Sequence, residues 1–276
     1  MNNPLVSIII PCYNTASYIE ETLKSVLDQT FKKWEAIIVN DDSPDNTEQI
    51  IQKWLDKDKR FKYYKKKNGG LADTRIFGIE KSTGKYIFPL DSDDYIDCNY
   101  LQKAVNILES DSKIEILYCE VMKFGEQTGV FKLEEFSLDY LLIKNCIISA
   151  AFFRKSTYDK VGGYCKSLKF LEDWDLWISI LKNGGKVHKI NEILFFYRIR
   201  KSGSLINNLY HDMNLYNEYH DIIFKRHLDA FLEHIGNPFL IKRDQLELEK
   251  YKNKVQSNRV YRLFQFLKRI KSNIFL

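Results

Sequence analysis

The 276-residue sequence lacks the features of membrane-spanning and secreted proteins. No apolar stretch approaches the roughly 20 residues that a membrane-spanning helix needs. The N-terminus has no basic segment followed by an apolar one, so we expect no secretory signal peptide. No Cys-x-x-Cys pair occurs among the five scattered cysteines Cys12, Cys98, Cys119, Cys146 and Cys165. We therefore predict a cytoplasmic protein with reduced, mainly structural thiols.

Two common phosphate-binding loops are also missing. The first apolar run is not followed by Gly-x-Gly-x-x-Gly, and no Gly-x-x-x-x-Gly-Lys-Ser/Thr occurs. A ligand with phosphate groups would therefore need a metal ion or Arg and Lys side chains. The composition itself, 45% hydrophobic and 29% charged, is that of a globular protein, and the chain is long enough to bury a full core.

Positive charge is concentrated at the C-terminus. Residues 250–276 contain eight Lys and Arg and no Asp or Glu, which gives them a charge of +8. The net charge of the whole chain is +5, so the other residues together carry −3. Apolar residues recur there at helical spacing, as Val260, Leu263, Phe264, Leu267, Ile270 and Ile274. A basic amphipathic helix of this kind can lie on an anionic membrane surface, on the inner face of the cell membrane. The alternative is a helix that packs on the domain or in a dimer.

Short apolar runs alternate with helical patterns over about the first 90 residues. The runs that we expect to be buried strands are Val6–Ile10, Ala36–Val39, Phe61–Tyr64 and Tyr86–Leu90. This alternation predicts an α/β fold with a doubly wound, mainly parallel sheet flanked by helices. We expect a catalytic domain over 1–205 and a helical C-terminal extension over 206–276 that ends in the basic amphipathic tail.

Polar side chains follow the predicted strands where each strand ends. Tyr13 follows the first strand, Asp41 the second, and Asp91, Asp93 and Asp94 follow the strand at 86–90. Because parallel strands share one carboxyl edge, where α/β sheets bind ligands, these residues should lie close together. Two acids separated by one residue suit a hard divalent cation that also holds phosphate oxygens. The alternative is a solvated acidic turn that caps the next helix.

A further acid, Asp173, lies in the first turn of a predicted helix. The segment 171–177 reads Leu-Glu-Asp-Trp-Asp-Leu-Trp, and its apolar residues continue at helical spacing. The helix dipole favours an ionised carboxylate in the first turn. Asp173 is therefore a candidate general base, although it could also be only a helix cap.

Several motifs, in order, resemble one known family. They are Val-Ser-Ile-Ile-Ile-Pro-Cys-Tyr-Asn (6–14), Asp-Gln-Thr-Phe (28–31), Val-Asn-Asp-Asp-Ser-Pro-Asp-Asn-Thr (39–47), Gly-Lys-Tyr-Ile-Phe-Pro-Leu-Asp-Ser-Asp-Asp (84–94) and Glu-Asp-Trp-Asp-Leu-Trp (172–177). From about residue 5 to 205 the chain resembles the family 2 glycosyltransferases, which are inverting enzymes with the GT-A fold.

The resemblance implies a set of nucleotide-sugar contacts: Pro11, Tyr13, Asp41, Arg75, Asp91, Ser92, Arg198 and Arg200. Tyr13 would stack on the base, usually uracil, and Asp41 would accept a base N–H. Arg75 would lie near the nucleotide or its phosphates. Arg198 and Arg200 would lie near the leaving diphosphate.

The resemblance also implies the metal and the base. Asp91 and Asp93, with Asp94 nearby, would bind Mg²⁺ or Mn²⁺ on the diphosphate, and Asp173 would be the general base. Three positions depart from the usual pattern: Asp42 stands where Gly is usual, Ile76 where Asn is common, and Arg200 where many members have His.

We therefore predict a metal-dependent, inverting glycosyltransferase. The donor would be a UDP-sugar, and the acceptor a saccharide or lipid-linked glycan in bacterial cell-surface polysaccharide synthesis. The alternatives are a nucleotidyltransferase acting on sugar phosphates and a non-catalytic nucleotide-sugar-binding family member. The negative charge outside the tail argues against nucleic-acid binding.

Overall fold

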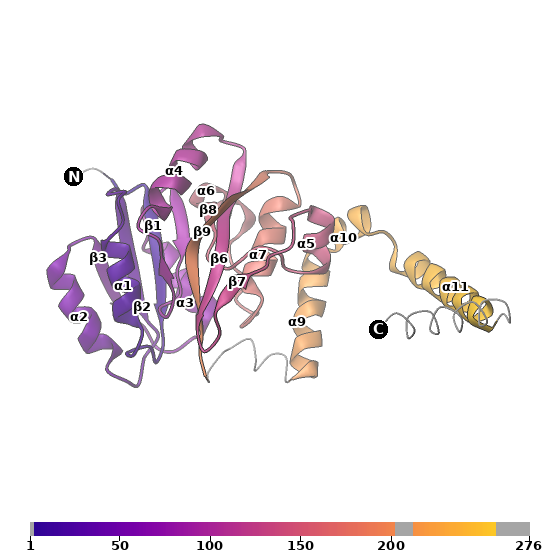
Figure 1. Ribbon diagram of the computed structural model, residues 1–276, viewed down its shortest axis with the longest axis horizontal. Coiled ribbons are helices and arrows are strands. Elements are labelled where there is room, and N and C mark those ends of the chain that lie inside the picture. The colour runs from indigo at the N-terminus through magenta and orange to yellow at the C-terminus, as the bar shows by residue number, and fades with distance from the viewer. Residues whose placement is uncertain (1–2, 202–211, 258–276) are drawn as a thin grey trace, which may run out of the picture. The chain divides into compact units, whose positions relative to one another are not determined.

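The computed structural model describes residues 3–201 and 212–257 (Figure 1). The chain divides into two compact units, with the boundary between His227 and Leu228. The helix α9 (Met213–Arg226), which we assigned to the extension from the sequence, therefore groups with the sheet-containing unit. The second unit contains α10 (Leu228–His234) and α11 (Pro238–Ser257).

Within the described residues, nine strands form one mixed sheet in the order β3-β2-β1-β4-β8-β6-β9-β5, with β7 paired to β6. The strands are β1 (Val6–Cys12), β2 (Trp34–Asn40), β3 (Phe61–Lys65), β4 (Tyr86–Pro89), β5 (Tyr95–Ile96), β6 (Ile114–Gly125), β7 (Gly129–Phe131), β8 (Phe152–Arg154) and β9 (Lys186–Ile199). The first four strands are parallel, as predicted. From β8 onward parallel and antiparallel pairs mix.

One strand extends beyond its predicted end, and another contains a bulge. β1 was predicted to end at Ile10, but it continues through Pro11 to Cys12. Its pairing with β4 ends at Ile9 and Pro89, so no strand partner on that side requires the backbone N–H that proline lacks. The segment Lys186–Ile199 forms the single long strand β9. Its register against β6 jumps from Ile190 to Ile193, so the two polar residues between them form a bulge within one strand.

Helices cover both faces of the sheet, as expected for a doubly wound fold. In the described part of the sheet unit they are α1 (Ile19–Leu27), α2 (Thr47–Lys57), α3 (Leu71–Glu80), α4 (Tyr100–Ser110), α5 (Leu138–Ile143), α6 (Lys155–Val161), α7 (Glu172–Leu181) and α9. Ile8 and Ile38 belong to the apolar cluster that includes the inner faces of α1, α2 and α4. Ile9 and Ile37, which point the other way, lie against α3, where Gly78 permits a close approach.

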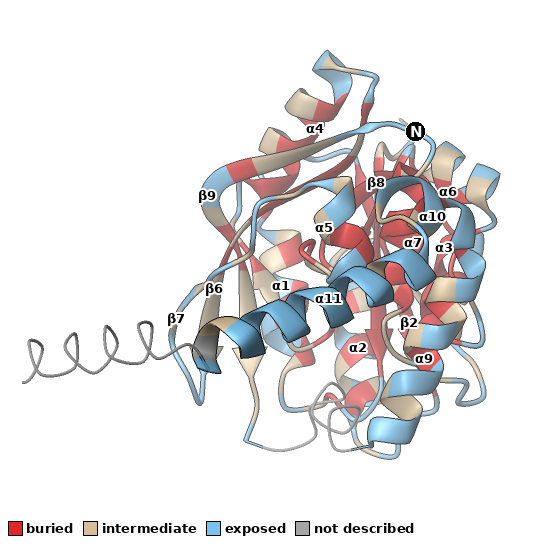
Figure 2. Ribbon diagram, turned by 90° about the vertical axis from the view of Figure 1, so that its right-hand side faces the viewer, coloured by how far each residue is buried: buried red, intermediate tan, exposed pale blue. Residues whose placement is uncertain are grey.

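No helix in the described part of the chain is both long enough and apolar enough to span a membrane. α11 is exposed along nearly its whole length (Figure 2), with large apolar side chains such as Phe239 and Tyr251 on its surface. The predicted amphipathic stripe from Val260 to Ile274 lies outside the described residues.

Candidate active site

The parallel register of β1, β2 and β4 brings their carboxyl ends to one edge of the sheet. Tyr13 and Asp41 follow β1 and β2 there, and Asp91 comes two residues after β4. Tyr13 is 53% exposed, whereas Pro11 is buried within β1. The residues that the sequence places at strand ends therefore do share one edge.

Asp41 is buried and closes the loop that precedes α3. Its carboxylate accepts the N–H groups of Gly69 (3.0 Å) and Gly70 (2.9 Å) and pairs with the Lys66 ammonium (2.7 Å). The next residue, Asp42, has φ 62°. That left-handed backbone is one that glycine favours and Asp tolerates, so the turn survives where the family usually has Gly.

A buried arginine joins two carboxylates from distant parts of the chain. Arg75 in α3 donates to Asp91 Oδ1 (2.7 Å) and to Glu172 Oε1 (2.5 Å). Its side chain is only 2% exposed, against 29% for Asp91. Burial acts to lower the pKa of Arg75, but the two carboxylates outweigh it and raise that pKa. Burial raises the pKa of Glu172 to about 7, although Arg75 opposes the change.

Asp173 follows Glu172 in the first turn of α7 and is partly buried. Its Oδ1 accepts the Trp174 N–H (2.8 Å), and its Oδ2 accepts the side-chain amide of Asn145 (3.1 Å). Burial raises the pKa of Asp173, while Arg75 and these hydrogen bonds oppose the rise. A carboxylate held at both oxygens, with its pKa raised above the ordinary value, is a better proton acceptor than an exposed aspartate.

Asp93 and Asp94 pair with the end of β9. Asp94 is buried, and its Oδ1 accepts the backbone N–H of Arg198 (2.8 Å). Arg198 Nε donates to the backbone carbonyl of Asp93 (2.7 Å), and the Asp93 carboxylate forms an ion pair with Arg200 (2.5 Å). Burial raises the pKa of both acids. The negative charge of Asp91 raises the pKa of Asp93 further, and the charges of Asp93 and Asp91 raise that of Asp94 further.

The two arginines at the end of β9 also contact α1 and the residue before it. Arg198 forms an ion pair with Glu21, and both guanidinium groups lie over the Tyr18 ring, 4.9 Å and 4.7 Å from its centroid. Ser92, by contrast, is buried and donates to the Thr15 hydroxyl (3.2 Å).

The acidic segment fits a divalent cation that arrives with a diphosphate. Among the described residues, no group of three or more His, Cys, Asp and Glu side chains is arranged to hold a metal ion. Mg²⁺ commonly takes only one or two carboxylates and fills its other positions with phosphate oxygens and water. Asp91 and Asp93 provide two carboxylates, and the arginine ion pairs engage one oxygen of each.

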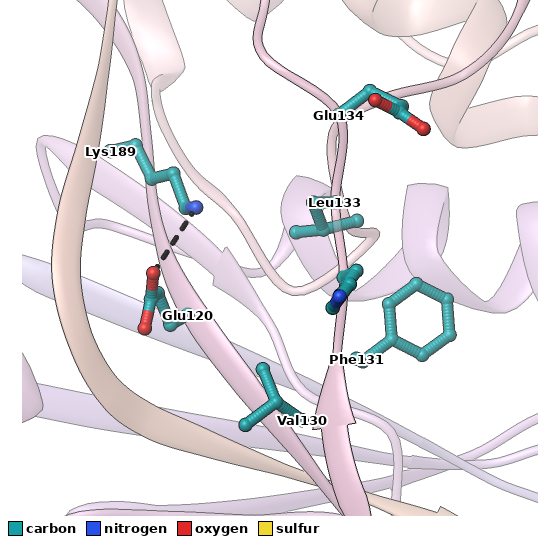
Figure 3. Close-up of a pocket in the computed structure, with 7 residues that line it drawn as sticks. Glu120, Val130, Phe131, Leu133, Glu134 and Lys189 are labelled. Carbon is teal, nitrogen blue, oxygen red and sulfur yellow. Dashed lines mark hydrogen bonds and ion pairs between the residues drawn. The ribbon is translucent and has the colours of Figure 1, made fainter.

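Several contributors to the site were not predicted from the sequence, among them Tyr18, Glu21, Asn145 and Glu172. Glu172 was visible only as a neighbour of Asp173, and Asn145 lies in an irregular segment with no periodic signal. A separate hollow of about 360 Å³ lies away from these residues (Figure 3). One side is formed by β7 and the residues that follow it, and the other by the ion pair between Glu120 of β6 and Lys189 of β9. It contains none of the predicted site residues.

Solved glycosyltransferase structures share this fold. TarS of S. aureus, residues 1–349 in complex with UDP, superposes with a TM-score of 0.61 at 23% identity, over 70% of this chain and 60% of that one. The mannosyltransferase PcManGT of Pyrobaculum calidifontis, in complex with GDP-Man and Mn²⁺, gives a TM-score of 0.61 at 17% identity, over 96% and 84%. The predicted GT-A fold is thereby confirmed.

Sequence comparison gives the family. An uncharacterized glycosyltransferase of Rickettsia typhi is 35% identical over 71% of this chain, which spans 64% of that protein's length. The putative teichuronic acid biosynthesis glycosyltransferase TuaG of Bacillus subtilis is 34% identical over 71% of this chain and 79% of its own. The model of glycosyl transferase family 2 matches residues 7–165. The resemblance predicted from the motifs is therefore confirmed, and the chain belongs to glycosyl transferase family 2.

Proposed function

We propose that this chain transfers a sugar from a UDP-sugar to a saccharide acceptor, with inversion at the anomeric carbon. The observation that carries the proposal is the setting of Asp173. Its carboxylate lies at the start of α7, next to Glu172, which Arg75 connects to Asp91 at the sheet edge. This arrangement supports a proton acceptor and a diphosphate site held in fixed relation to each other.

In the proposed reaction, Asp173 accepts the proton of an acceptor hydroxyl as its oxygen attacks the anomeric carbon. A new C–O bond forms, the bond from that carbon to the diphosphate breaks, and the nucleoside diphosphate leaves with the electron pair. A single displacement with one base gives inversion. The hydrogen bonds from Trp174 and Asn145 hold the carboxylate in place.

Positive charge near the leaving diphosphate would come from this chain and from a cation. Asp91 and Asp93 would hold Mg²⁺ or Mn²⁺, which supplies charge neutralisation on the diphosphate when bound. We assign Asp94 to fixing the end of β9, because it is buried against the Arg198 backbone. Arg200, which stands where His is common in the family, would keep this end of the site positive.

The base of the nucleotide would lie at the exposed Tyr13 ring, next to Asp41. UDP as the nucleotide is supported by TarS, which binds UDP and UDP-GlcNAc, although PcManGT binds GDP-Man. A role in bacterial cell-surface polysaccharide synthesis is supported by the likeness to the putative teichuronic acid enzyme. We propose that the basic segment 250–276 attaches the protein peripherally to the membrane, where lipid-linked acceptors lie.

The decisive experiment measures nucleotide release from a panel of UDP- and GDP-sugars, with saccharide and lipid-linked acceptors. We expect turnover of at least one UDP-sugar in Mg²⁺ or Mn²⁺, and its loss in EDTA with recovery when metal is restored. Turnover that survives EDTA would contradict the metal assignment. The enzymatic proposal fails if no donor is consumed under any of these conditions.

A further inference from the structure

Arg75 occupies the buried face of its helix. Within α3 it takes its place in the stripe Ala72, Arg75, Ile76 and Ile79, all of them buried. The helix is held close to β1 because Gly78 has no side chain; a Cβ there would lie 2.7 Å from Ile9 Cγ2. The backbone that carries Arg75 is therefore fixed against the sheet.

The guanidinium uses a different nitrogen for each acid. Nη2 contacts Asp91, 16 residues away after β4, and Nη1 contacts Glu172, 97 residues away at the start of α7. The planar fork of arginine can bridge two carboxylates in a set geometry, whereas the single ammonium of lysine cannot. Arg75 thus connects the strand end that faces the diphosphate to the helix that carries Asp173.

Two features leave this guanidinium little capacity to contact a donor directly. Its side chain is 2% exposed, and both terminal nitrogens are engaged by carboxylates at 2.7 Å or less. Glu172 is buried in turn, and a buried carboxylate requires a positive partner. Immediately before it, Leu171 has φ 61°, a left-handed conformation that leucine rarely adopts and that surrounding contacts must maintain.

We propose that Arg75 is a positioning residue that sets the separation between Asp91 and Asp173, and that it does not bind the nucleotide. The inference rests on the proposed function of these two acids. Arg75 acts through Glu172, which precedes Asp173 in the first turn of α7. Loss of either ion pair would let that turn shift relative to the diphosphate site.

The test uses the full chain with Arg75→Lys, Glu172→Gln and the double variant. Arg60→Lys is the matched control, because Arg60 pairs with Asp58 (2.7 Å) in the loop before β3, outside the site. For each protein we would measure kcat, the Kd for UDP in Mg²⁺ by calorimetry, and hydrogen exchange of the first turn of α7. Exchange needs no turnover and therefore tests the positioning role by itself.

We expect Arg75→Lys and Glu172→Gln each to lower kcat on the order of 100-fold, as misplacement of a reacting group does, while the Kd for UDP changes less than about threefold. The double variant should be little worse than either single one, since both break the same connection. A UDP Kd weakened more than about tenfold in Arg75→Lys but not in Glu172→Gln would mean that Arg75 binds the donor, and would overturn the proposal.

Unchanged kcat in both folded variants would also overturn it. If the wild-type protein consumes no donor, the proposed function fails, and exchange decides the positioning role instead. Faster hydrogen exchange at the start of α7 in Arg75→Lys, with a wild-type rate in Arg60→Lys, would support the positioning role. An unchanged rate in Arg75→Lys would refute it. Should Arg75→Lys fail to fold, Glu172→Gln carries the same comparison with a neutral side chain of equal size.

Discussion

The substitution Asp173→Asn removes the proposed proton acceptor but keeps most of the contacts that hold its side chain. Asparagine keeps the size of aspartate, and its carbonyl oxygen can still accept the Trp174 N–H. Its amide nitrogen would then face the Asn145 amide nitrogen, so one hydrogen bond is lost. Asn145 cannot simply rotate to restore it, because its own carbonyl oxygen accepts the Ile147 N–H (3.1 Å).

The cost to folding should be small. One lost hydrogen bond costs about 1 kcal/mol. Against this, burial raises the pKa of Asp173, so its ionised form destabilises the folded state at neutral pH, and the neutral amide removes that penalty. Since 1 kcal/mol moves the Tm of a protein this large by roughly 2–4 °C, the two opposing effects should leave Tm within about 4 °C.

The cost to turnover should be large. A positioned general base contributes about 10²- to 10⁴-fold, so kcat should fall by that factor while UDP binding is kept. In the wild type, kcat/KM should fall as pH decreases through the raised pKa of Asp173, so the acid limb should lie above the ordinary Asp value of 3.8. Asp159→Asn is the control, because Asp159 pairs with Lys155 on the exposed surface of α6. Near wild-type kcat in folded Asp173→Asn would refute the base assignment.

Two further predictions concern stability and membrane contact. Glu35 accepts the Ser7 hydroxyl and pairs with Lys62. Burial acts to raise the pKa of Glu35, but these partners outweigh it and lower that pKa in the folded state. The ionised carboxylate therefore stabilises the protein at pH values above the unfolded-state pKa. That stability is lost as the pH falls through the folded-state pKa. Glu35→Gln should therefore lower the urea midpoint at pH 7 by the equivalent of about 2 kcal/mol and flatten its acid dependence, whereas an identical midpoint would contradict this. Deleting residues 250–276 should abolish sedimentation with anionic liposomes, with neutral liposomes as the control; undiminished binding would exclude the tail as the anchor.

The sequence by itself determined the parallel half of the sheet and the edge at which the site lies. β1, β2 and β4 each contain a short run of apolar residues, long enough to be buried and too short for a helix, whereas β3 includes two lysines and is only partly buried. The helical connections between them make the strands parallel, so all their carboxyl ends lie on one edge. The gathering of Tyr13, Asp41 and Asp91 could therefore be predicted without coordinates.

Only the tertiary structure decided which charges meet. The spacing of Ala72, Arg75, Ile76 and Ile79 does indicate that Arg75 lies on the buried face of α3. That spacing carries no information on the partner, because Glu172 lies 97 residues away and the pairing depends on where the rest of the fold places the start of α7. Asn145 was equally unpredictable, since irregular segments have no periodicity to fix their course. The sequence thus places the acids at one edge, and long-range packing sets their partners and their pKa values.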